Sequence, residues 1–228
     1  IFMIRSKKDY RYYLAADRVA LGISEQIDLS LKRFLINFLL PDYRWKYQKL
    51  MRSIEYRTNC KKGLFNRIIL FVLQIKFKRL GFRLLVSIYP NTCGPGLNIA
   101  HTGPIRISKG VKIGSNCRIH ISTNIGIQAG TSEDSAVIGN NVYIGPGVKF
   151  VKSCTIANNI AIGANSVITK SFETEGVSIA GIPAKVVNSN IDTRKILIPA
   201  TELLDQGIYN TKGMTNAAIF EKYINNKD

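Results

Sequence analysis

The sequence predicts a parallel β-solenoid preceded by an α-helical region, and three observations support this fold class. An aliphatic or aromatic residue recurs at every sixth position through the middle of the chain. Small or apolar residues recur four positions after it, with Gly and Asn where the chain would turn. The N-terminal third lacks this repeat and shows helical spacing instead. A period of six fits neither an α-helix nor an alternating strand, but it fits short strands joined by tight turns.

The six-residue repeat runs through the central part of the chain with a single slip. Its members are Ile107, Ile113, Ile119, Ile125, Ile138, Ile144, Phe150, Ile156, Ile162 and Ile168. Three such strands make one triangular coil of about eighteen residues, so stacked coils would bury aliphatic columns. The slip falls after Ile125, where the polar stretch 130–135 predicts a loop that leaves the stack.

Continued backwards, the repeat places His101, Pro95 and Tyr89 at its positions and predicts that regular coils begin near residue 88. His101 then stands where an inward aliphatic residue is expected, which predicts a special conformation there. Cys93, Cys117 and Cys154 fall at the fourth places, and we interpret them as core residues in a reducing cytoplasm. The four cysteines show no metal-ligand spacing, so the sequence predicts no metal site.

The N-terminal third predicts helices. Ser6 and Asp9 form a capping-box-like start for the first helix, which ends before Gly22. Further helices are expected at residues 29–40, 45–57, 64–80 and, near the C-terminus, 216–224. We therefore divide the chain into a basic α-helical domain, a solenoid domain and a C-terminal extension, at residues 1–86, 87–190 and 191–228.

The net charge of +17 lies mainly in the N-terminal third. Residues 1–86 hold 19 Lys and Arg against 6 Asp and Glu, which gives +13. Such a region can be a solvated face, a docking surface for anionic lipids or a nucleic-acid patch. No nucleic-acid-binding motif accompanies it, so we expect no nucleic-acid partner. No secretory signal and no apolar stretch of about eighteen residues occur. We expect a cytoplasmic protein, with a peripheral contact at the inner face of the cell membrane as one hypothesis.

With the repeat, His101 and the closing run Ile179–Val187 in place, the chain resembles the hexapeptide-repeat acyltransferases. It is most similar to their serine acetyltransferase branch and to related O-acetyltransferases of surface-polysaccharide gene clusters. The resemblance covers residues 87–187, and residues 1–86 only in general layout. It implies a left-handed parallel β-helix, a hand that periodicity alone could not give. It also implies a homotrimer, acetyl-CoA in grooves between neighbouring β-helices, and direct acetyl transfer to a hydroxyl or amine. Pairing of trimers through the helices is left open.

The resemblance implies that His101, in the stretch Asn98–Gly103, is the catalytic general base. An imidazole with a pKa near 7 can take the proton of a neutral hydroxyl as that hydroxyl attacks a thioester. The alternative interpretation is a polar residue at an irregular first corner. His120 lies about one coil further along and matches the family less well. It is either a surface or interface residue or part of the acceptor pocket.

The stretch Gly163–Lys170 resembles the late-coil segment that contacts the cofactor in related acetyltransferases. Lys185 is a candidate partner for the nucleotide phosphates of coenzyme A. Glycines serve turn geometry in any case, and a lysine can equally be a solvated side chain. The candidate coenzyme A contacts are Gly126, Gly145, Gly163, Ala164, Thr169, Lys170 and Lys185.

Two departures from serine acetyltransferases bear on the acceptor. The acidic residue that precedes their catalytic histidine has no counterpart in Ser87-Ile88-Tyr89-Pro90, and their second histidine falls on Ser135. An amino acid needs partners for its ammonium and carboxylate, whereas a sugar hydroxyl needs neither. We therefore expect acetyl transfer to a sugar hydroxyl of a surface or capsular polysaccharide or its lipid-linked precursor. Ser87 and Tyr89, like His120, are candidate substrate-binding residues, and the hydroxyl of Ser87 or Tyr89, or a backbone carbonyl, would orient His101. Serine O-acetyltransferase and a non-catalytic trimeric scaffold remain the alternatives.

Overall fold

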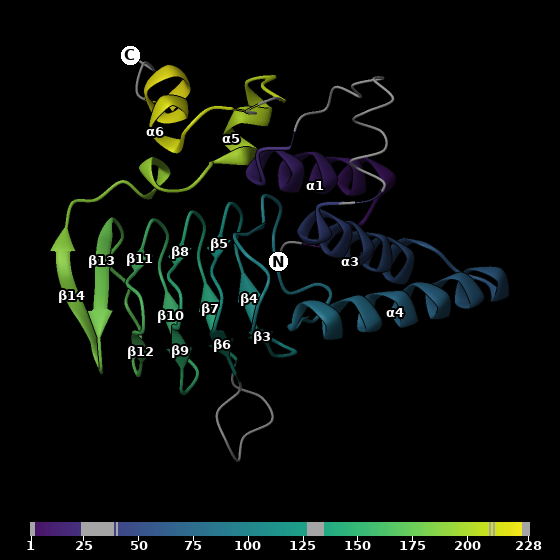
Figure 1. The fold of residues 1–228 in the computed structure, drawn as a ribbon, viewed down its shortest axis with the longest axis horizontal. Helices are drawn as coiled ribbons and strands as arrows, with labels where there is room; N and C mark the ends of the chain where they lie inside the picture. The colour runs from purple at the N-terminus through teal and green to yellow at the C-terminus, as the bar shows by residue number, and fades with distance from the viewer. Residues whose placement is uncertain are drawn as a thin grey trace.

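A computed structural model of the chain describes residues 3–23, 39, 41–126, 135–209, 211 and 213–224. The chain begins with long helices, continues as a solenoid of short strands and ends in short helices (Figure 1). The helices are α1 (Lys7–Ala20), α3 (Tyr43–Cys60), α4 (Leu64–Leu84), α5 (Ala200–Asp205) and α6 (Asn216–Ile219), with a 3-10 turn at Thr193–Lys195 and a π-helical turn at Phe220–Ile224. The helices predicted near 45–57, 64–80 and 216–224 are confirmed. Apart from Leu39, the helix predicted at 29–40 lies outside the described residues, as does the predicted loop up to residue 134.

Helix α1 begins where the sequence predicts. The Ser6 hydroxyl accepts a hydrogen bond from the Asp9 amide at 3.0 Å. The Asp9 carboxylate accepts from the Arg5 amide at 2.9 Å, one residue before the cap. The reciprocal bonds satisfy free amides at the helix start in the manner of a capping box.

Short strands form the three faces of a prism. They are β1 (Val86–Ile88), β2 (Asn98–Ile99), β3 (Ile105–Ile107), β4 (Lys112–Ile113), β5 (Arg118–Ile119), β6 (Thr123–Ile125), β7 (Val137–Ile138), β8 (Tyr143–Ile144), β9 (Lys149–Phe150), β10 (Thr155–Ile156), β11 (Ala161–Ile162), β12 (Val167–Ile168), β13 (Val177–Gly181) and β14 (Ala184–Ser189). The sheet orders are β1-β3-β6-β9-β12, β10-β7-β4 and β14-β13-β11-β8-β5-β2. Neighbouring strands pair in parallel, except that β14 runs antiparallel to β13. This confirms the predicted parallel β-helix.

The repeat residues from Ile107 onwards point inwards and stack in register. In the five-stranded sheet Ile107, Ile125, Phe150 and Ile168 lie side by side on successive strands, and all are buried. The three cysteines predicted as core residues, Cys93, Cys117 and Cys154, are buried free thiols. One hydrophobic cluster therefore runs the length of the prism, as the repeat predicts.

The first coil departs from the backward extension of the repeat, and here the prediction was wrong. Ile88 pairs with Ile107 and Ile99 pairs with Ile119, so Ile88 and Ile99 are the inward residues. Tyr89 and His101, which the extension placed on the repeat, are exposed. The repeat fails there because the corner of the first coil that carries His101 contains more residues than the equivalent corners of later coils.

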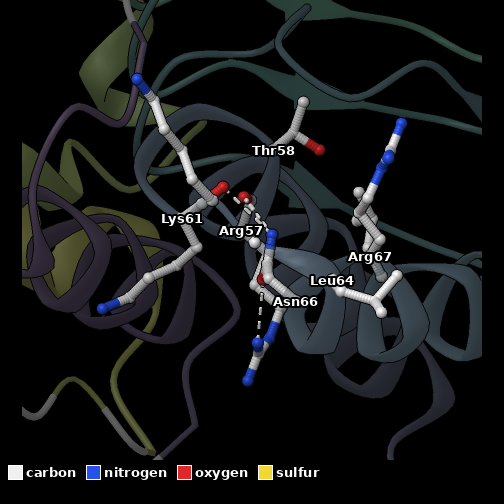
Figure 2. Close-up of a pocket in the computed structure, with 9 residues that line it drawn as sticks. Arg57, Thr58, Lys61, Leu64, Asn66 and Arg67 are labelled. Atoms are coloured by element: carbon white, nitrogen blue, oxygen red, sulfur yellow. Dashed lines mark hydrogen bonds between the residues drawn. The ribbon is translucent and has the colours of Figure 1, made fainter.

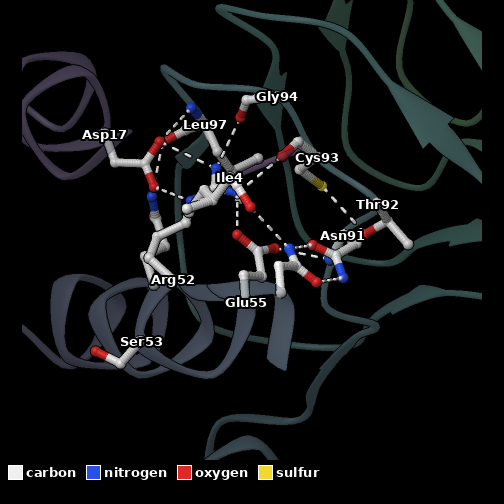
Figure 3. A network of polar contacts seen from close by, with 12 residues as sticks. Ile4, Asp17, Arg52, Ser53, Glu55, Asn91, Thr92, Cys93, Gly94 and Leu97 are labelled. Carbon is white, nitrogen blue, oxygen red and sulfur yellow. Dashed lines mark hydrogen bonds and ion pairs between the residues drawn. The ribbon is translucent and has the colours of Figure 1, made fainter. Parts of the chain in front are cut away.

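A buried polar network joins the helices to this first coil (Figure 3). Arg52 of α3 donates to Asp17 of α1, at 2.8 and 3.2 Å, and to Glu55 at 3.0 Å. Its remaining N–H groups reach the carbonyls of Cys93 and Gly94 at 2.8 and 2.7 Å. All five guanidinium donors are thus used, which a buried arginine requires. The network fixes α1 and α3 against the start of the prism.

The C-terminal segment returns to the N-terminal helix. α5 packs against α1, and a second hydrophobic cluster combines Ala16, Val19 and Ala20 of α1 with residues of α5, α6 and the segment before α5. The last part of the chain therefore lies beside the first (Figure 1).

Candidate active site

The corner that carries His101 is longer than the later corners. Four residue steps separate the inward residues Ile119 and Thr123, and likewise Ile144 and Val148. Six steps separate their counterparts Ile99 and Ile105. The two additional residues let the chain bulge out of the stack, so His101 stands exposed at the corner rather than inside the prism.

Gly103 makes this bulge possible. Its φ is +153°, and a Cβ on it would lie 2.9 Å from the side chain of Ile121 in the next coil. The Gly103 amide donates to the carbonyl of Leu84, at the end of α4, at 3.1 Å. A glycine is therefore needed two residues after His101 for both backbone conformation and close approach.

Two residues that the sequence did not single out hold the other side of the corner. Arg44 donates to the carbonyl of Ala100, the residue before His101, at 2.8 Å. Its other nitrogens bond both oxygens of Asp42, at 3.1 and 2.7 Å. Burial alone would raise the pKa of Asp42, but the hydrogen bonds and positive charge of Arg44 and a hydrogen bond from the Trp45 amide outweigh it, and the pKa is lowered. Asp42 also caps α3, and this capping role was the one available sequence signal.

The structure brings the two histidines together. The ring centroids of His101 and His120 are 5.9 Å apart, and those of His120 and Tyr143 are 5.1 Å apart. Burial, followed by the positive charge of Arg118 and the proximity of His101, lowers the pKa of His120 to about 4. His120 is therefore neutral at pH 7. Its Nε2 is buried with no partner among the described residues, an unmade bond that a ligand could complete.

A polar cavity of about 270 Å³ adjoins the corner, because Ala100 lines it. Arg44, Asn98 and Arg118 also line this cavity, and the Nε of Arg118 is buried without a partner among the described residues. His101 and His120 do not line this cavity, and the Nε of Arg118 is the donor there that could meet a ligand.

Several predicted coenzyme A contacts share one edge with His120. The amides of His120, Gly145 and Gly163 occupy equivalent places in successive coils. Each amide donates a hydrogen bond to the backbone carbonyl of the inward residue in the next coil along the chain. Ala180 takes the same place in the last coil as Gly163 does in the coil before it. Lys185 of β14 pairs with Ala180 of β13. The edge therefore leads from the histidines, past two glycines, to a lysine.

Close stacking of the coils requires both glycines. A Cβ on Gly145 would lie 2.7 Å from the carbonyl oxygen of Ile162, and one on Gly163 would lie 2.9 Å from the Cβ of Ala180. Ala164, the next residue, is exposed at the same corner. Because no side chain projects at the glycines, this edge can accommodate an extended ligand.

The remaining candidates lie elsewhere. Gly126 and Thr169 follow paired strands of the five-stranded sheet, as Tyr89 does, so these three share a different edge. Lys170 follows Thr169, and its ammonium lies 5.6 Å from the ring centroid of Phe172. Ser87 and Tyr89 line a groove of about 630 Å³ between α4 and β1, which His101 does not line. Within one chain, the candidates therefore divide between two edges of the prism.

The two histidines are arranged for general base chemistry on a bound hydroxyl. An exposed imidazole can take a proton from a bound hydroxyl, and a neutral second histidine can supply a hydrogen bond. Among the described residues, no three His, Cys, Asp or Glu side chains gather as metal ligands.

Comparison with known proteins supports the predicted resemblance. Residues 135–170 match the family model described as bacterial transferase hexapeptide (six repeats). A serine acetyltransferase of Synechococcus elongatus is 30% identical over 107 residues, which are 45% of this chain and 42% of that protein. The Escherichia coli protein named "Putative lipopolysaccharide biosynthesis O-acetyl transferase WbbJ" is 42% identical over 67 residues, which are 29% of this chain and 34% of that protein.

The fold also matches solved structures. Serine acetyltransferase from Brucella abortus strain S19, solved in complex with coenzyme A, superposes with a TM-score of 0.58 at 20% identity, over 81% of this chain and 68% of that one. The resemblance to hexapeptide-repeat acyltransferases and the left-handed β-helix are thereby confirmed. The chain spans less than half the length of the two curated relatives above.

Proposed function

We propose that this hexapeptide-repeat protein is an acetyl-CoA-dependent O-acetyltransferase with His101 as its general base. The exposed imidazole in an enlarged corner, beside a neutral His120, carries this proposal. Similarity to proteins named as acetyltransferases supports it.

In the proposed reaction His101 moves one proton twice. As the acceptor hydroxyl oxygen bonds to the thioester carbonyl carbon, the imidazole takes the hydroxyl proton. When the carbon–sulfur bond breaks, the imidazolium returns that proton to the departing thiolate. Corner amides that are not bonded between coils would stabilise the negative charge on the carbonyl oxygen, and His120 holds the acceptor through its free Nε2.

The residues fit acetyl-CoA as the donor. Gly145, Gly163 and Ala164 leave an edge without large side chains, and Lys185 at its far end can pair with phosphate. Gly126, Thr169 and Lys170 lie on another edge and would reach the same groove from a neighbouring subunit. We therefore propose a homotrimer, in which each site has walls from two chains.

For the acceptor we propose a sugar hydroxyl of a surface polysaccharide or of its lipid-linked precursor. The positions that carry an acid and a second histidine in serine acetyltransferases are Ser87–Pro90 and Ser135 in this chain. The similarity to WbbJ supports the same acceptor class. The excess charge of residues 1–86 supports a peripheral contact with an anionic membrane, where lipid-linked acceptors reside.

The second candidate is serine O-acetyltransferase. The similarity to the Synechococcus enzyme favours it. So does Arg118, whose positive charge acts on His120 and whose Nε has no partner among the described residues, because a guanidinium can pair with a carboxylate.

A thiol-release assay separates these candidates. Purified protein with acetyl-CoA would be offered serine and a set of mono- and oligosaccharides, and release of free thiol would be followed. Cys60→Ser is the appropriate background, since Cys60 is only partly buried while the other cysteines are inaccessible. We expect glycan turnover above serine turnover, and robust serine turnover would overturn the choice. No affinity for coenzyme A by calorimetry would favour a non-catalytic scaffold.

A further inference from the structure

Helix α4 exposes a stripe of large apolar side chains. Leu64, Phe71 and Phe82 are 73, 63 and 83% exposed, and Ile68 and Ile75 lie between them. The helix packs against the molecule through its other side, where Asn66, Phe77, Leu80 and Gly81 are buried. At about 100° per residue, Leu64, Phe71 and Phe82 point almost directly away from that packed side. The stripe therefore has no partner among the described residues.

Cations flank this stripe. At the same angular spacing, Arg67 and Lys78 lie on one side of it and Lys76 and Arg83 on the other, all exposed. The segment 61–85 contains seven Lys or Arg residues and no Asp or Glu.

The charge continues at the N-terminal end of α4. A cavity of about 400 Å³ lies between the end of α3 and the start of α4, and four cationic residues line it. Figure 2 shows that the side chains of Lys61 and Arg67 extend from this region, while Arg57 bonds the Asn66 side chain at 3.1 Å. The lining cations are Arg57, Lys61, Lys62 and Arg67.

An apolar stripe flanked by cations favours one kind of partner for the exposed face of α4 over another. A second copy of α4 would bring two cationic segments together with no acid to compensate, which is unfavourable. An anionic bilayer supplies both an apolar boundary for the stripe and phosphates for the flanking cations. Among the described residues, no helix is long and apolar enough to cross a bilayer, so the contact would lie in the plane of the surface.

We propose that α4 docks lengthwise on an anionic phospholipid surface, through Leu64, Ile68, Phe71, Ile75 and Phe82, with its flanking cations against the headgroup phosphates. Figure 1 shows α4 along one side of the helical region, with its N-terminal end far from the solenoid. Its C-terminal end is bonded to the corner of His101 through Gly103. Docking would thus bring the candidate active site to the membrane surface. That consequence rests on the proposed function, whereas the docking itself does not.

Vesicle flotation tests the proposal. The full chain should float with vesicles of equal parts phosphatidylglycerol and phosphatidylcholine at low salt, and should stay unbound with phosphatidylcholine alone. Phe71→Ser with Ile75→Ser should lower the partition coefficient at least tenfold. Lys76→Gln with Lys78→Gln, which removes one cation from each side of the stripe, should lower it by about fivefold for each cation removed, and less at high salt.

Matched controls give the test its specificity. Val137→Ser with Tyr209→Ser removes exposed apolar side chains away from α4, and Lys109→Gln with Lys112→Gln removes exposed cations from the β-helix. Both controls should bind vesicles as the wild type does.

Two results would overturn the docking proposal. One is wild-type protein that does not float with anionic vesicles. The other is an α4 apolar variant that floats normally but has a smaller particle mass by light scattering, because the stripe would then join copies of the chain. Calorimetry with coenzyme A on the same variants should show unchanged affinity, so failure of docking and failure of the proposed activity can be told apart.

Discussion

At the scale of single residues, His101 carries the proposed chemistry. Replacing it with alanine removes the base and leaves the glycine-lined edge intact. We expect His101→Ala to lower turnover by about 10²–10⁴-fold, with coenzyme A affinity unchanged by calorimetry. Near-normal turnover would remove His101 from the mechanism.

The neighbouring His120 should make stability depend on pH. Its folded-state pKa of about 4 lies below the value of 6.5 for a free histidine, so the unfolded chain binds the proton first. The stabilising effect is complete above pH 6.5 and is lost as the pH falls from 6.5 towards 4. His120 is partly exposed, so after solvent screening we expect about 1 kcal/mol or less.

Thermal unfolding at pH 7.5 and pH 5 measures this effect. Between pH 7.5 and pH 5 the melting temperature of the wild type should fall further than that of His120→Gln. Subtracting the two falls removes the contribution of other groups that titrate in the same pH range. Equal falls would mean that the environment of His120 does not disfavour its charged form.

At the scale of elements, the long corner before β3 distinguishes the first coil. Deleting Thr102 and Gly103 together would reduce six residue steps to the four of later corners. We expect a folded protein with coenzyme A affinity and without turnover, because His101 would lose the bulge that exposes it. Circular dichroism and the thiol-release assay measure the two properties, and full turnover would show that the bulge is dispensable.

The Arg52 network should dominate the attachment of the helices. Arg52→Met leaves the carboxylates of Asp17 and Glu55 buried without their cation. Removing one partner of a buried ion pair costs about 3–5 kcal/mol, and we expect a loss of that size in chemical denaturation. Arg194→Met is the control, since its pair with Asp192 is about one-third exposed and should cost about 1 kcal/mol or less. Equal losses would contradict this role of the network.

The repeat made the solenoid predictable, because each coil buries one aliphatic residue per strand and the spacing follows directly. It failed at Tyr89 and His101, because the first coil has corners of irregular length and nothing in the spacing marks where two residues bulge. Arg44 and Arg118 could not be found from the sequence either. Arg44 is separated from Ala100 by 56 residues, and only the packing of α3 on the first coil brings them together.

At the scale of the whole molecule, two hydrophobic clusters organise the chain. One joins α3 and α4 to the prism, and the other joins α1 to α5 and α6. Helices from the N-terminal region thus share a core with the solenoid, and the C-terminal segment shares one with α1. The division at residues 86 and 190 stays a prediction about folding units. The first cluster spans the boundary at residue 86, and the second joins residues before 86 to residues after 190.

The candidate site residues lie on two different edges of one prism, and the proposed trimer gives a way to test whether both edges contribute to one site. If each site takes His101 from one chain and Thr169 with Lys170 from its neighbour, two inactive variants can complement each other. Co-expression of His101→Ala with Thr169→Ala/Lys170→Ala in equal amounts would assemble both wild-type edges at about a quarter of the interfaces. We expect about that fraction of wild-type turnover from the mixture, although each variant alone is inactive.

A matched mixture isolates the cause of any recovered activity. Co-expressing His101→Ala with a chain that carries His101→Ala as well as Thr169→Ala/Lys170→Ala leaves no interface with an intact base, and that mixture should stay inactive. An inactive test mixture whose mixed trimers are verified by mass spectrometry would mean that the two edges never meet in one site. Because His101 and Lys170 lie on different edges of one prism, recovery would require the site to lie between two prisms.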